Sequence, residues 1–339
     1  MTRLLEVENL TVSFRTDEGP ITPVQGVSFG VDAGRTLGIV GESGSGKSVS
    51  TKAVMRLLPG NARISADSRI AFTDRAGAPI AVHALRPGAR ALRRLRGGEI
   101  GMIFQEPMAS FSPVYTIGNQ IIETIRLHRG LHGAAARDLA VEMLTKVGIS
   151  NPGARVDQYP HELSGGMRQR AMIALALSAG PRLLIADEPT TALDVTIQAQ
   201  VIDLMAGLQR DLGMAMIFIT HDLGVIAQVA DDVAVMYLGT IVEQGPVRQV
   251  LTSPAHPYTQ GLIAAIPRLD RIDHRLTPVP GEIPSPSARP SGCPFRTRCA
   301  QAILGVCARE APGVTPLAGG RTVRCHLVAR ERAVTCATP

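Results

Sequence analysis

Three observations predict an α/β fold organised around a phosphate-binding loop. First, the apolar run Thr36–Val40 leads directly into the glycine-rich octapeptide Gly41–Ser48 (GESGSGKS), and a helix-like segment follows it. Second, the apolar run Leu183–Ala186 reads as a buried strand that delivers two carboxylates, Asp187 and Glu188, to its end. Third, short runs within residues 3–40 alternate apolar and polar side chains, which is typical of antiparallel strands with one exposed face.

Length and composition restrict the function. The chain has 339 residues, 45% hydrophobic and 19% charged, which is enough for one large or two modest globular domains. No apolar run approaches the ~20 residues that span a bilayer, and the N-terminus lacks a signal peptide, so we expect a cytosolic protein that reaches membranes only through partners. The net charge is +6, but aromatic residues make up only 3%. Too few rings are present for base stacking, and we expect no nucleic-acid partner.

The N-terminal strands carry one candidate for base recognition. Residues 5–14 and 26–31 show the period of two, and Phe14 ends the first run. An aromatic side chain ahead of a phosphate loop can stack on adenine. Packing in the strand core explains Phe14 equally well, so both interpretations stay open.

Each residue type in the loop serves phosphate binding. Glycines let backbone N–H groups converge on phosphate oxygens, and the helix that follows adds partial positive charge. Lys47 reaches the β- and γ-phosphates, and the Ser48 hydroxyl can ligate Mg²⁺. The chain has 3 lysines and 32 arginines, so a lysine at this position is an improbable accident.

Further strand ends and helix starts carry polar side chains. The buried run Ile100–Phe104 ends at Gln105, and Ala215–Thr220 ends at His221. Helical periodicity from about 112 to 180 predicts a helical insert in the α/β core. Within it, the small residues Ser164–Gly166 open a helix whose bare N–H groups form a second anion site.

These motifs, in this order, resemble the nucleotide-binding subunit of an ABC transporter. The resemblance covers residues 3 to about 250 and includes the phosphate loop, Gln105, Leu163–Gly166, Asp187–Glu188, Ala192–Asp194 and His221. It implies a P-loop NTPase core with an N-terminal antiparallel β subdomain. We place the ATPase domain at 1–250, its helical subdomain at about 106–180, and a C-terminal extension at 251–339.

The resemblance also implies the roles of individual residues toward ATP and Mg²⁺. Glu188 is the general base, or orients the attacking water, and Lys47, Gln105 and His221 complete the catalytic set. Asp187, Ser48 and Gln105 form the Mg²⁺ site. Besides Phe14, the nucleotide-binding residues are Gly41, Ser43, Gly44, Ser45, Gly46, Lys47, Ser48, Val49, Gln105, Ser164, Gly165, Gly166, Gln169, Asp194 and His221.

The C-terminal extension has a different composition. Five prolines between 278 and 290 predict a stiff connector, and all five cysteines lie in the last 47 residues. Cys293, Cys299, Cys307 and Cys325 are separated by 5, 7 and 17 residues. In a reducing compartment this clustering favours a metal site over disulfides. The spacing alone leaves an iron–sulfur cluster, zinc and unligated thiols open.

The extension resembles that of oligopeptide/dipeptide (and nickel) importer ATPases. Its hallmarks are His256–Thr259, Gly281–Pro284 and Gly292–Cys299. Members of that branch can bind a [4Fe–4S] cluster, so the resemblance implies that Cys293, Cys299, Cys307 and Cys325 ligate one. Two positions depart from the branch: Thr297 replaces a proline, and Ser110–Pro113 reads Ser-Phe-Ser-Pro instead of Ser-Leu-Asn-Pro. Cys336 has no assigned role.

The sequence therefore predicts the ATP-hydrolysing subunit of a bacterial ABC importer, with peptides as cargo. The expected partners are a second ATPase (different, or alternatively identical), two membrane permeases and an extracytoplasmic binding protein. We expect it at the cytoplasmic face of the membrane. Close relatives carry nickel or oligosaccharides, and a soluble ABC ATPase outside transport is an alternative, as is a redox sensor in the tail.

Overall fold

The computed structural model describes all residues except 1, 106–109, 192, 267–278 and 337–339; the side chains of 333–336 are also left undescribed. Its contacts divide the chain into two compact units. The first consists of residues 1–5, 31–36 and 72–219, and the second of 6–30, 37–71 and 220–339. Among the described residues, no helix has the length and apolar character needed to cross a membrane.

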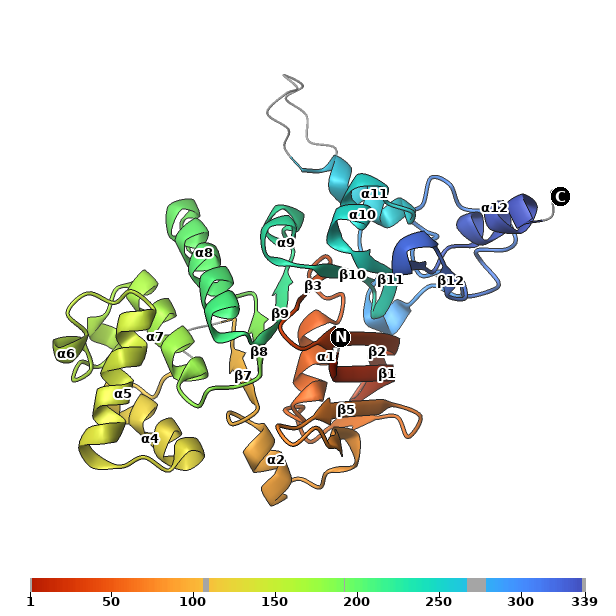
Figure 1. The fold of residues 1–339 in the computed structure, drawn as a ribbon. Helices are drawn as coiled ribbons and strands as arrows, with labels where there is room; N and C mark the ends of the chain where they lie inside the picture. Colours follow the sequence, from red (N-terminus) through yellow and green to blue (C-terminus); the bar gives the residue numbers. More distant parts are fainter. Residues whose placement is uncertain (1, 106–109, 192, 267–278, 337–339) are drawn as a thin grey trace. The chain divides into compact units, whose positions relative to one another are not determined.

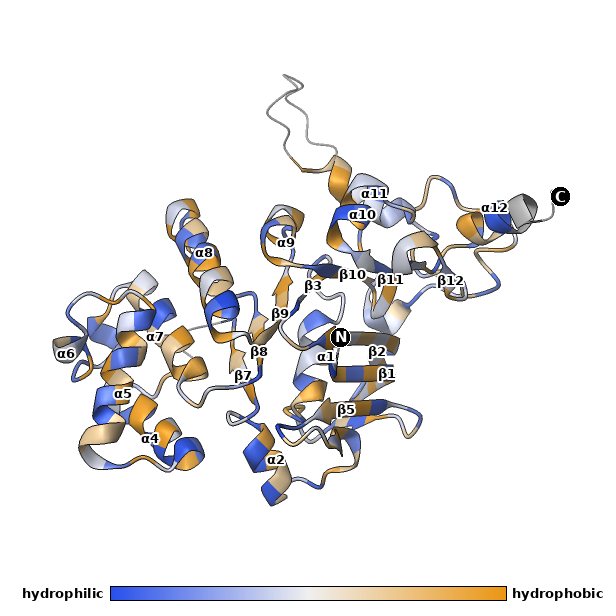
Figure 2. Cartoon of the chain, in the orientation of Figure 1, coloured by the Kyte–Doolittle hydropathy of each residue, from blue (hydrophilic) through white to orange (hydrophobic). Residues whose placement is uncertain are grey.

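The first unit is built on three parallel strands. β7 (Ile100–Ile103) pairs with β8 (Leu183–Asp187), which pairs with β9 (Ala215–Thr220). All residues of these strands are buried and most are apolar, as Figure 2 shows by their orange colour, and strands buried on both faces need such sequences. The strands bring their carboxyl ends, and the residues that follow them, to one edge of the sheet.

Helices make up most of the rest of this unit (Figure 1). α4 begins at the capping residue Thr116 and ends at Gly130 in the left-handed conformation, and it buries the predicted stripe Ile117, Ile121 and Ile125. The elements are β6 (Pro79–Ala81), α2 (Arg90–Leu95), α4 (Ile117–Arg129), α5 (Gly133–Lys146), α6 (Pro152–Arg155), α7 (Gly165–Leu177) and α8 (Val195–Leu212), with short 3₁₀ turns at Val82–Ala84 and Pro160–Glu162.

The second unit contains the predicted antiparallel N-terminal sheet. β1 (Arg3–Thr16) lies between β2 (Gly19–Asp32) and β5 (Arg69–Thr73), and β4 (Ala62–Ile64) also pairs with β1. Leu5, Val7, Leu10 and Val12 of β1 are buried, while residues between them are more exposed. The alternating runs therefore predicted these antiparallel strands, although the alternation of buried residues changes phase at Asn9, between Val7 and Leu10.

A second sheet in this unit has the order β12-β13-β11-β10-β3. β3 (Thr36–Val40) is parallel to β10, and the phosphate loop joins it to α1 (Lys47–Val54). The other elements are α9 (Leu223–Val229), β10 (Asp232–Tyr237), β11 (Thr240–Pro246), α10 (Val247–Thr252), α11 (Pro257–Ala264), β12 (Thr315–Pro316), β13 (Thr322–Val323) and α12 (His326–Cys336), with 3₁₀ turns at Pro286–Ala288 and Ala318–Gly320.

The C-terminal extension is part of this second sheet. β13 pairs with β11 through Glu243↔Val323 and Gln244↔Thr322, and β12 pairs with β13. The cysteine-containing segment is thereby fixed to the sheet that carries the phosphate loop. The domain boundaries predicted from the sequence, including the one at 250, stay predictions.

Candidate functional site

The phosphate loop lies between a strand and a helix, as predicted. At two of its glycines a larger residue does not fit, because a Cβ atom would clash with the neighbouring backbone. A Cβ on Gly41 would lie 2.2 Å from the Met236 carbonyl oxygen. One on Gly46 would lie 2.5 Å from the Pro23 carbonyl oxygen, and Gly46 also has a φ of +94°. Side chains at these positions would force the loop off its neighbouring strands.

Lys47 is held along the loop backbone. Its Nζ donates to the carbonyl oxygens of Gly41 at 2.7 Å and Glu42 at 3.0 Å, and the side chain is buried. The loop is closed by Ser45 N–H to the Glu42 carbonyl at 3.2 Å and by Gly239 N–H to the Ser45 carbonyl at 2.9 Å. The ammonium is thus held against the loop backbone by two carbonyl oxygens.

Ser45 gives the clearest sign that this loop binds a ligand. Its side chain is only 2% exposed, and its hydroxyl has no hydrogen-bond partner among the described residues. A buried hydroxyl without a partner costs free energy, which a phosphate oxygen as acceptor would recover. Ser48 and Val49 follow in the first turn of α1, both half-buried. These observations fit a phosphate-bearing ligand.

The acidic pair lies at the carboxyl end of β8 in the first unit. Asp187 is buried, and Glu188 follows in the left-handed region with a φ of +48°. The backbone N–H of Glu188 donates to the Ile219 carbonyl at 3.0 Å. Gln105 Nε2 and Thr191 Oγ1 both donate to Glu188 Oε2, at 3.2 and 3.0 Å. The structure therefore brings together Gln105 and Glu188, two residues of the predicted catalytic set.

Two of the predicted nucleotide-binding residues, Ser164 of the second anion site and Asp194, act as helix caps. The Ser164 hydroxyl accepts from Met167 N–H at 3.3 Å and begins α7, and Asp194 accepts from Ile197 N–H at 2.9 Å and begins α8. Around Gly165 a Cβ would meet no atom within 4 Å, so the start of α7 is open. Gln169 is buried and donates to the Pro189 carbonyl.

The remaining predicted residues are more dispersed. His221 follows β9 and is exposed, and Phe14 lies half-buried in β1 opposite Ala62. Both belong to the second unit with the phosphate loop, whereas Gln105, Asp187, Glu188 and the helix-capping residues belong to the first. Ala192 and residues 106–109 lie outside the described residues.

The predicted iron–sulfur site is not supported. Among the described residues, no group of three or more His, Cys, Asp or Glu side chains is arranged to hold a metal ion. Burial raises the pKa of Cys293 to about 11 and also raises the pKa values of Cys299 and Cys325, and repulsion from the neighbouring cysteines adds to each of these shifts. Cys307 Sγ accepts a hydrogen bond from Ile303 N–H at 3.3 Å. Free thiols are found at Cys293, Cys299, Cys307 and Cys325. The side chain of Cys336 is not among the described ones.

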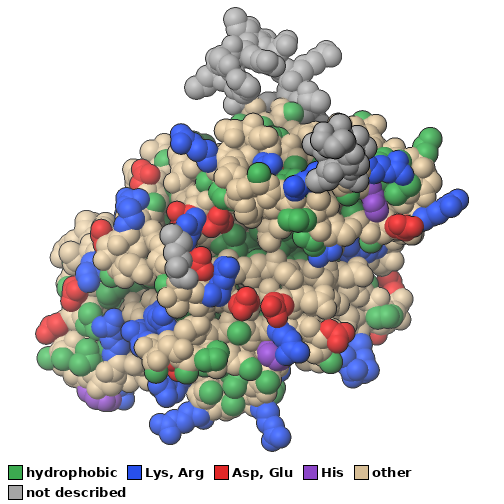
Figure 3. Space-filling model, turned by 45° about the vertical axis from the view of Figure 1, so that its right-hand side comes forward, with side chains coloured by type: hydrophobic (Ala, Val, Ile, Leu, Met, Phe, Trp, Pro, Cys, Tyr) green, Lys and Arg blue, Asp and Glu red, His purple; other side chains and the backbone are tan. Residues whose placement is uncertain are grey.

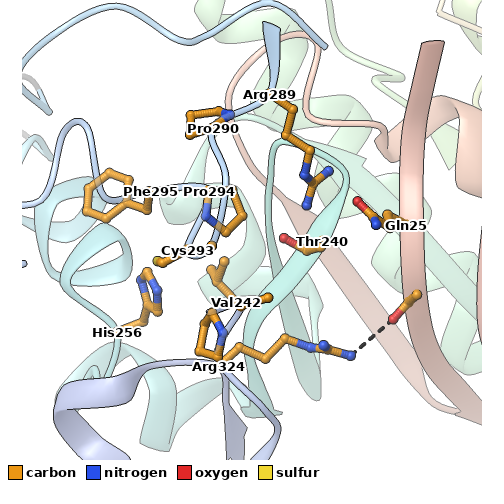
Figure 4. Close-up of a pocket in the computed structure, with 14 residues that line it drawn as sticks. Gln25, Thr240, Val242, His256, Arg289, Pro290, Cys293, Pro294, Phe295 and Arg324 are labelled. Carbon is orange, nitrogen blue, oxygen red and sulfur yellow. Dashed lines mark hydrogen bonds between the residues drawn. The ribbon is translucent and has the colours of Figure 1, made fainter. Parts of the chain in front are cut away.

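A cavity of about 350 Å³ adjoins the C-terminal extension rather than the phosphate loop (Figure 4). Cys293 and Phe295 line it together with Arg289 and Arg324. Arg324 donates to the Gly26 carbonyl at 3.1 Å, and Arg289 to the Leu238 carbonyl at 2.6 Å. Burial lowers the pKa of both arginines. This cavity is therefore not at the predicted nucleotide site.

The arginine-rich segment around residues 86–96 contributes to a polar cleft of about 710 Å³ in the first unit. Arg90 and Arg94 of α2 line it with Arg129, and Arg75 pairs there with Glu99 at 3.4 Å. On the face drawn in Figure 3, Lys and Arg side chains are spread among acidic ones. Positive charge on this face is therefore scattered.

Sequence reasoning missed two residues that contact the loop at Glu42 and a third that packs against both of them. Arg298 forms an ion pair with the Glu42 carboxylate, Tyr258 accepts a hydrogen bond from the Glu42 N–H, and Tyr237 packs beside both. A signal was present: an acidic side chain inside a loop that binds an anion needs a nearby cation. The cation lies 256 positions along the chain, where no spacing rule reaches.

Comparison with known proteins identifies the family. Residues 24–191 match the ABC transporter family, and residues 242–307 match the oligopeptide/dipeptide transporter C-terminal region. A peptide import ATP-binding protein of Brucella abortus is 48% identical over 334 residues, covering 96% of this chain and 98% of that protein. One of Brucella ovis is 47% identical over 334 residues, with the same coverage.

Solved structures agree with this assignment. The dimeric structure of an ATP-binding cassette in a post-hydrolysis state, bound to ADP and Pi, matches with a TM-score of 0.62 at 25% identity, covering 72% of this chain and 99% of that one. The cbiO1 protein of Clostridium perfringens, part of the ABC transporter complex cbiONQ, matches with a TM-score of 0.61 at 26% identity, covering 75% and 92%. The chain belongs to the ABC transporter family, as an ATP-hydrolysing subunit with the C-terminal region of the oligopeptide/dipeptide transporters.

Proposed function

We propose that this chain hydrolyses ATP to drive peptide uptake through two membrane permeases, at the cytoplasmic face of the cell membrane. The observation that carries the proposal is a phosphate loop whose buried Ser45 hydroxyl has no hydrogen-bond partner in the described part of the chain, which also has the oligopeptide/dipeptide C-terminal region. The relatives named as peptide import proteins support peptides as cargo. No observation favours nickel, oligosaccharides or a role outside transport.

In this proposal each residue has a specific role toward ATP or Mg²⁺. Backbone N–H groups of Gly41–Ser48 and the Lys47 ammonium bind the phosphates, and Ser45 donates to a phosphate oxygen. Phe14 stacks on the adenine ring. The hydroxyl of Ser48, the Asp187 carboxylate and the Gln105 amide oxygen suit Mg²⁺, which prefers oxygen ligands and neutralises charge on the phosphates when bound. His221 hydrogen-bonds the γ-phosphate.

Glu188 is the proposed general base. Its unusual left-handed backbone and its two hydrogen-bond donors, Gln105 and Thr191, fix the carboxylate at the strand end. Backbone strain of this kind costs free energy and is retained where geometry matters for function. The carboxylate accepts a proton from the attacking water while the nucleotide is held in line.

A second ATPase subunit completes the site in this proposal. The open start of α7, with Ser164, Gly165 and Gly166, faces the nucleotide of the partner, and Asp194 and Gln169 contribute from the same region. The dimeric cassette structure among the similar proteins supports such pairing. We propose a different, homologous partner, and an extracytoplasmic binding protein that delivers the peptide.

The test is Glu188→Gln in the complex with its permeases. ATP hydrolysis and uptake of a labelled peptide should fall by at least ~100-fold, because a general base contributes about 10²–10⁴-fold. ATP affinity should stay within about threefold, and ATP should accumulate in a closed dimer. Glu142→Gln, a matched exposed change on α5, is the control. Unchanged hydrolysis would refute the role of Glu188, and hydrolysis stimulated by sugars or nickel but not peptides would refute the cargo.

A further inference from the structure

Glu42 is neutralised by an arginine of the C-terminal extension. Arg298 Nη1 donates to Glu42 Oε2 at 2.7 Å, and Arg298 Nη2 donates to Glu42 Oε1 at 3.0 Å. Two parallel charge-assisted bonds fix both the distance and the orientation of the carboxylate. The Arg298 side chain is only 3% exposed, so the pair is shielded from water on the arginine side. Such a pair holds its geometry better than an exposed salt bridge.

Arg298 is itself fixed by hydrogen bonds and by a contact with an aromatic ring. Its Nε donates to the Pro280 carbonyl at 2.9 Å, its Nη2 donates to the Val279 carbonyl at 3.0 Å, and its guanidinium lies 5.7 Å from the centre of the Tyr237 ring. Burial by itself would lower the pKa of Arg298, but the hydrogen bonds and charge interactions with Glu42 and Tyr237 together outweigh it, and the pKa is raised. The arginine is therefore a rigid, permanently charged anchor.

Tyr258 holds the backbone of the same residue. Its hydroxyl accepts a hydrogen bond from the Glu42 N–H at 3.0 Å, and the side chain is fully buried. Its ring lies 4.8 Å from that of Tyr237 and 5.4 Å from that of Phe295, measured between centroids. Phe295 comes from the segment between Cys293 and Cys299. The aromatic cluster thus joins the extension to the loop independently of the ion pair.

All polar groups of Glu42 are engaged, and this has a consequence for Lys47. The Glu42 carbonyl accepts from the Lys47 ammonium and from Ser45 N–H, while Arg298 and Tyr258 hold its carboxylate and N–H. Because the extension fixes Glu42, it also fixes the backbone against which Lys47 and Ser45 are placed. A loop that is preorganised in this way loses less conformational entropy when it binds phosphates.

We propose that Arg298 and Tyr258 are positioning residues of the ATP site, so that the C-terminal extension holds the phosphate loop in its binding conformation. The proposal rests on the proposed phosphate-binding role of Gly41–Ser48. It assigns the extension a part in nucleotide binding, through an ion pair and an aromatic cluster.

The first experiment compares Arg298→Met with Arg296→Met in the full chain. Both remove one positive charge from the same segment, but Arg296 donates to Ser291 and makes no hydrogen bond or ion pair with the loop among the described residues. Calorimetric titration with ATP, without Mg²⁺ to prevent turnover, should show a Kd raised roughly 10- to 100-fold for Arg298→Met, the range expected for lost charge-assisted hydrogen bonds. Arg296→Met should stay near the parent value.

A double-mutant cycle distinguishes positioning of the loop by Arg298 from a general loss of structure. If Arg298 acts through Glu42, then adding Arg298→Met to Glu42→Gln should raise the Kd by less than threefold, far below the effect on the parent. Tyr258→Phe, which keeps the ring, gives an independent measure of the bond to the Glu42 N–H. Independent effects of Glu42→Gln and Arg298→Met, or an Arg298→Met affinity equal to that of Arg296→Met, would overturn the proposal.

Lys47→Ala separates this inference from the proposed function. If Lys47→Ala abolishes ATP binding while Arg298→Met does not weaken it, the loop binds phosphate but the extension does not position it. If Lys47→Ala binds ATP normally, the phosphate-binding role of the loop itself fails. Circular dichroism at the titration temperature verifies that every variant is folded.

Discussion

His256 is a single residue whose ionisation is tied to the stability of the fold. It is 1% exposed, its Nδ1 accepts from the Tyr258 N–H at 3.0 Å, and its own backbone N–H donates to the buried Glu243. Burial lowers the pKa of His256 to about 3. The folded chain therefore keeps this imidazole neutral at pH values where an unfolded chain protonates it.

This gives a prediction for acid stability. Between pH 6.5 and 3 the unfolded chain binds a proton that the folded chain excludes, so His256 destabilises the fold as pH falls, by up to about 1.4 kcal/mol per unit. His256→Asn keeps a side-chain acceptor at the start of α11 but removes the titration. Urea unfolding at pH 7.5 and 5 should show a smaller pH effect for the variant. Equal pH effects for both proteins would contradict the assignment.

At the scale of secondary structure, several helices near the proposed site begin with a side-chain cap. Ser164, Asp194 and Asp222 each accept a backbone N–H in the first turn of α7, α8 and α9. Two of them, Ser164 and Asp194, are also proposed nucleotide-binding residues. The same polar side chain can thus serve the helix and the ligand, and substitution of either residue changes two properties at once.

Two substitutions of Asp194 separate these properties. Asp194→Ala removes the cap of α8 and should lower the free energy of unfolding by about 1 kcal/mol, whereas Asp194→Asn, also a good cap, should lower it by only a few tenths. If the charge of Asp194 is needed at the nucleotide, both variants should lose ATPase activity. Denaturant melts measure the first property and steady-state hydrolysis the second. An equal loss of stability in both variants would show that the cap contributes little.

At the scale of the whole chain, the C-terminal extension is a structural part of the ATPase. It supplies β13 to the edge of β11, and Tyr258 and Phe295 cover Tyr237, which is 1% exposed. The extension therefore stabilises the sheet that carries the phosphate loop, in addition to its proposed effect on the loop itself.

A truncated chain should reveal this dependence. Ending the chain after Ser253 uncovers Tyr237 and leaves β11 as an edge strand, so the free energy of unfolding should fall by roughly 3–5 kcal/mol, the value of about two buried aromatic side chains. Exposed edges also promote association. Denaturant unfolding and size-exclusion chromatography measure the two effects. A monomeric truncated protein with the stability of the full chain would show that the extension folds independently.

Local patterns predicted much of the fold and the positions of the candidate site residues at strand ends and helix starts. The period of two in residues 5–14 predicted β1, and buried runs ending at polar residues predicted β7, β8 and β9 with Gln105, Glu188 and His221 behind them. Buried parallel strands require continuous apolar sequence, and phosphate binding requires glycine and lysine at fixed offsets. Both requirements act over a few residues, so they can be read directly from the chain.

The sequence by itself determined the family, the phosphate loop and the strand-end carboxylates, because each depends on neighbouring residues. Tertiary structure alone decided that Arg298 and Tyr258 meet Glu42, that Glu188 takes a left-handed backbone, and that the cysteines do not form a metal-binding group among the described residues. These features depend on which distant segments pack together. Burial, pairing of charges and ring contacts arise from that packing, and no local spacing encodes them.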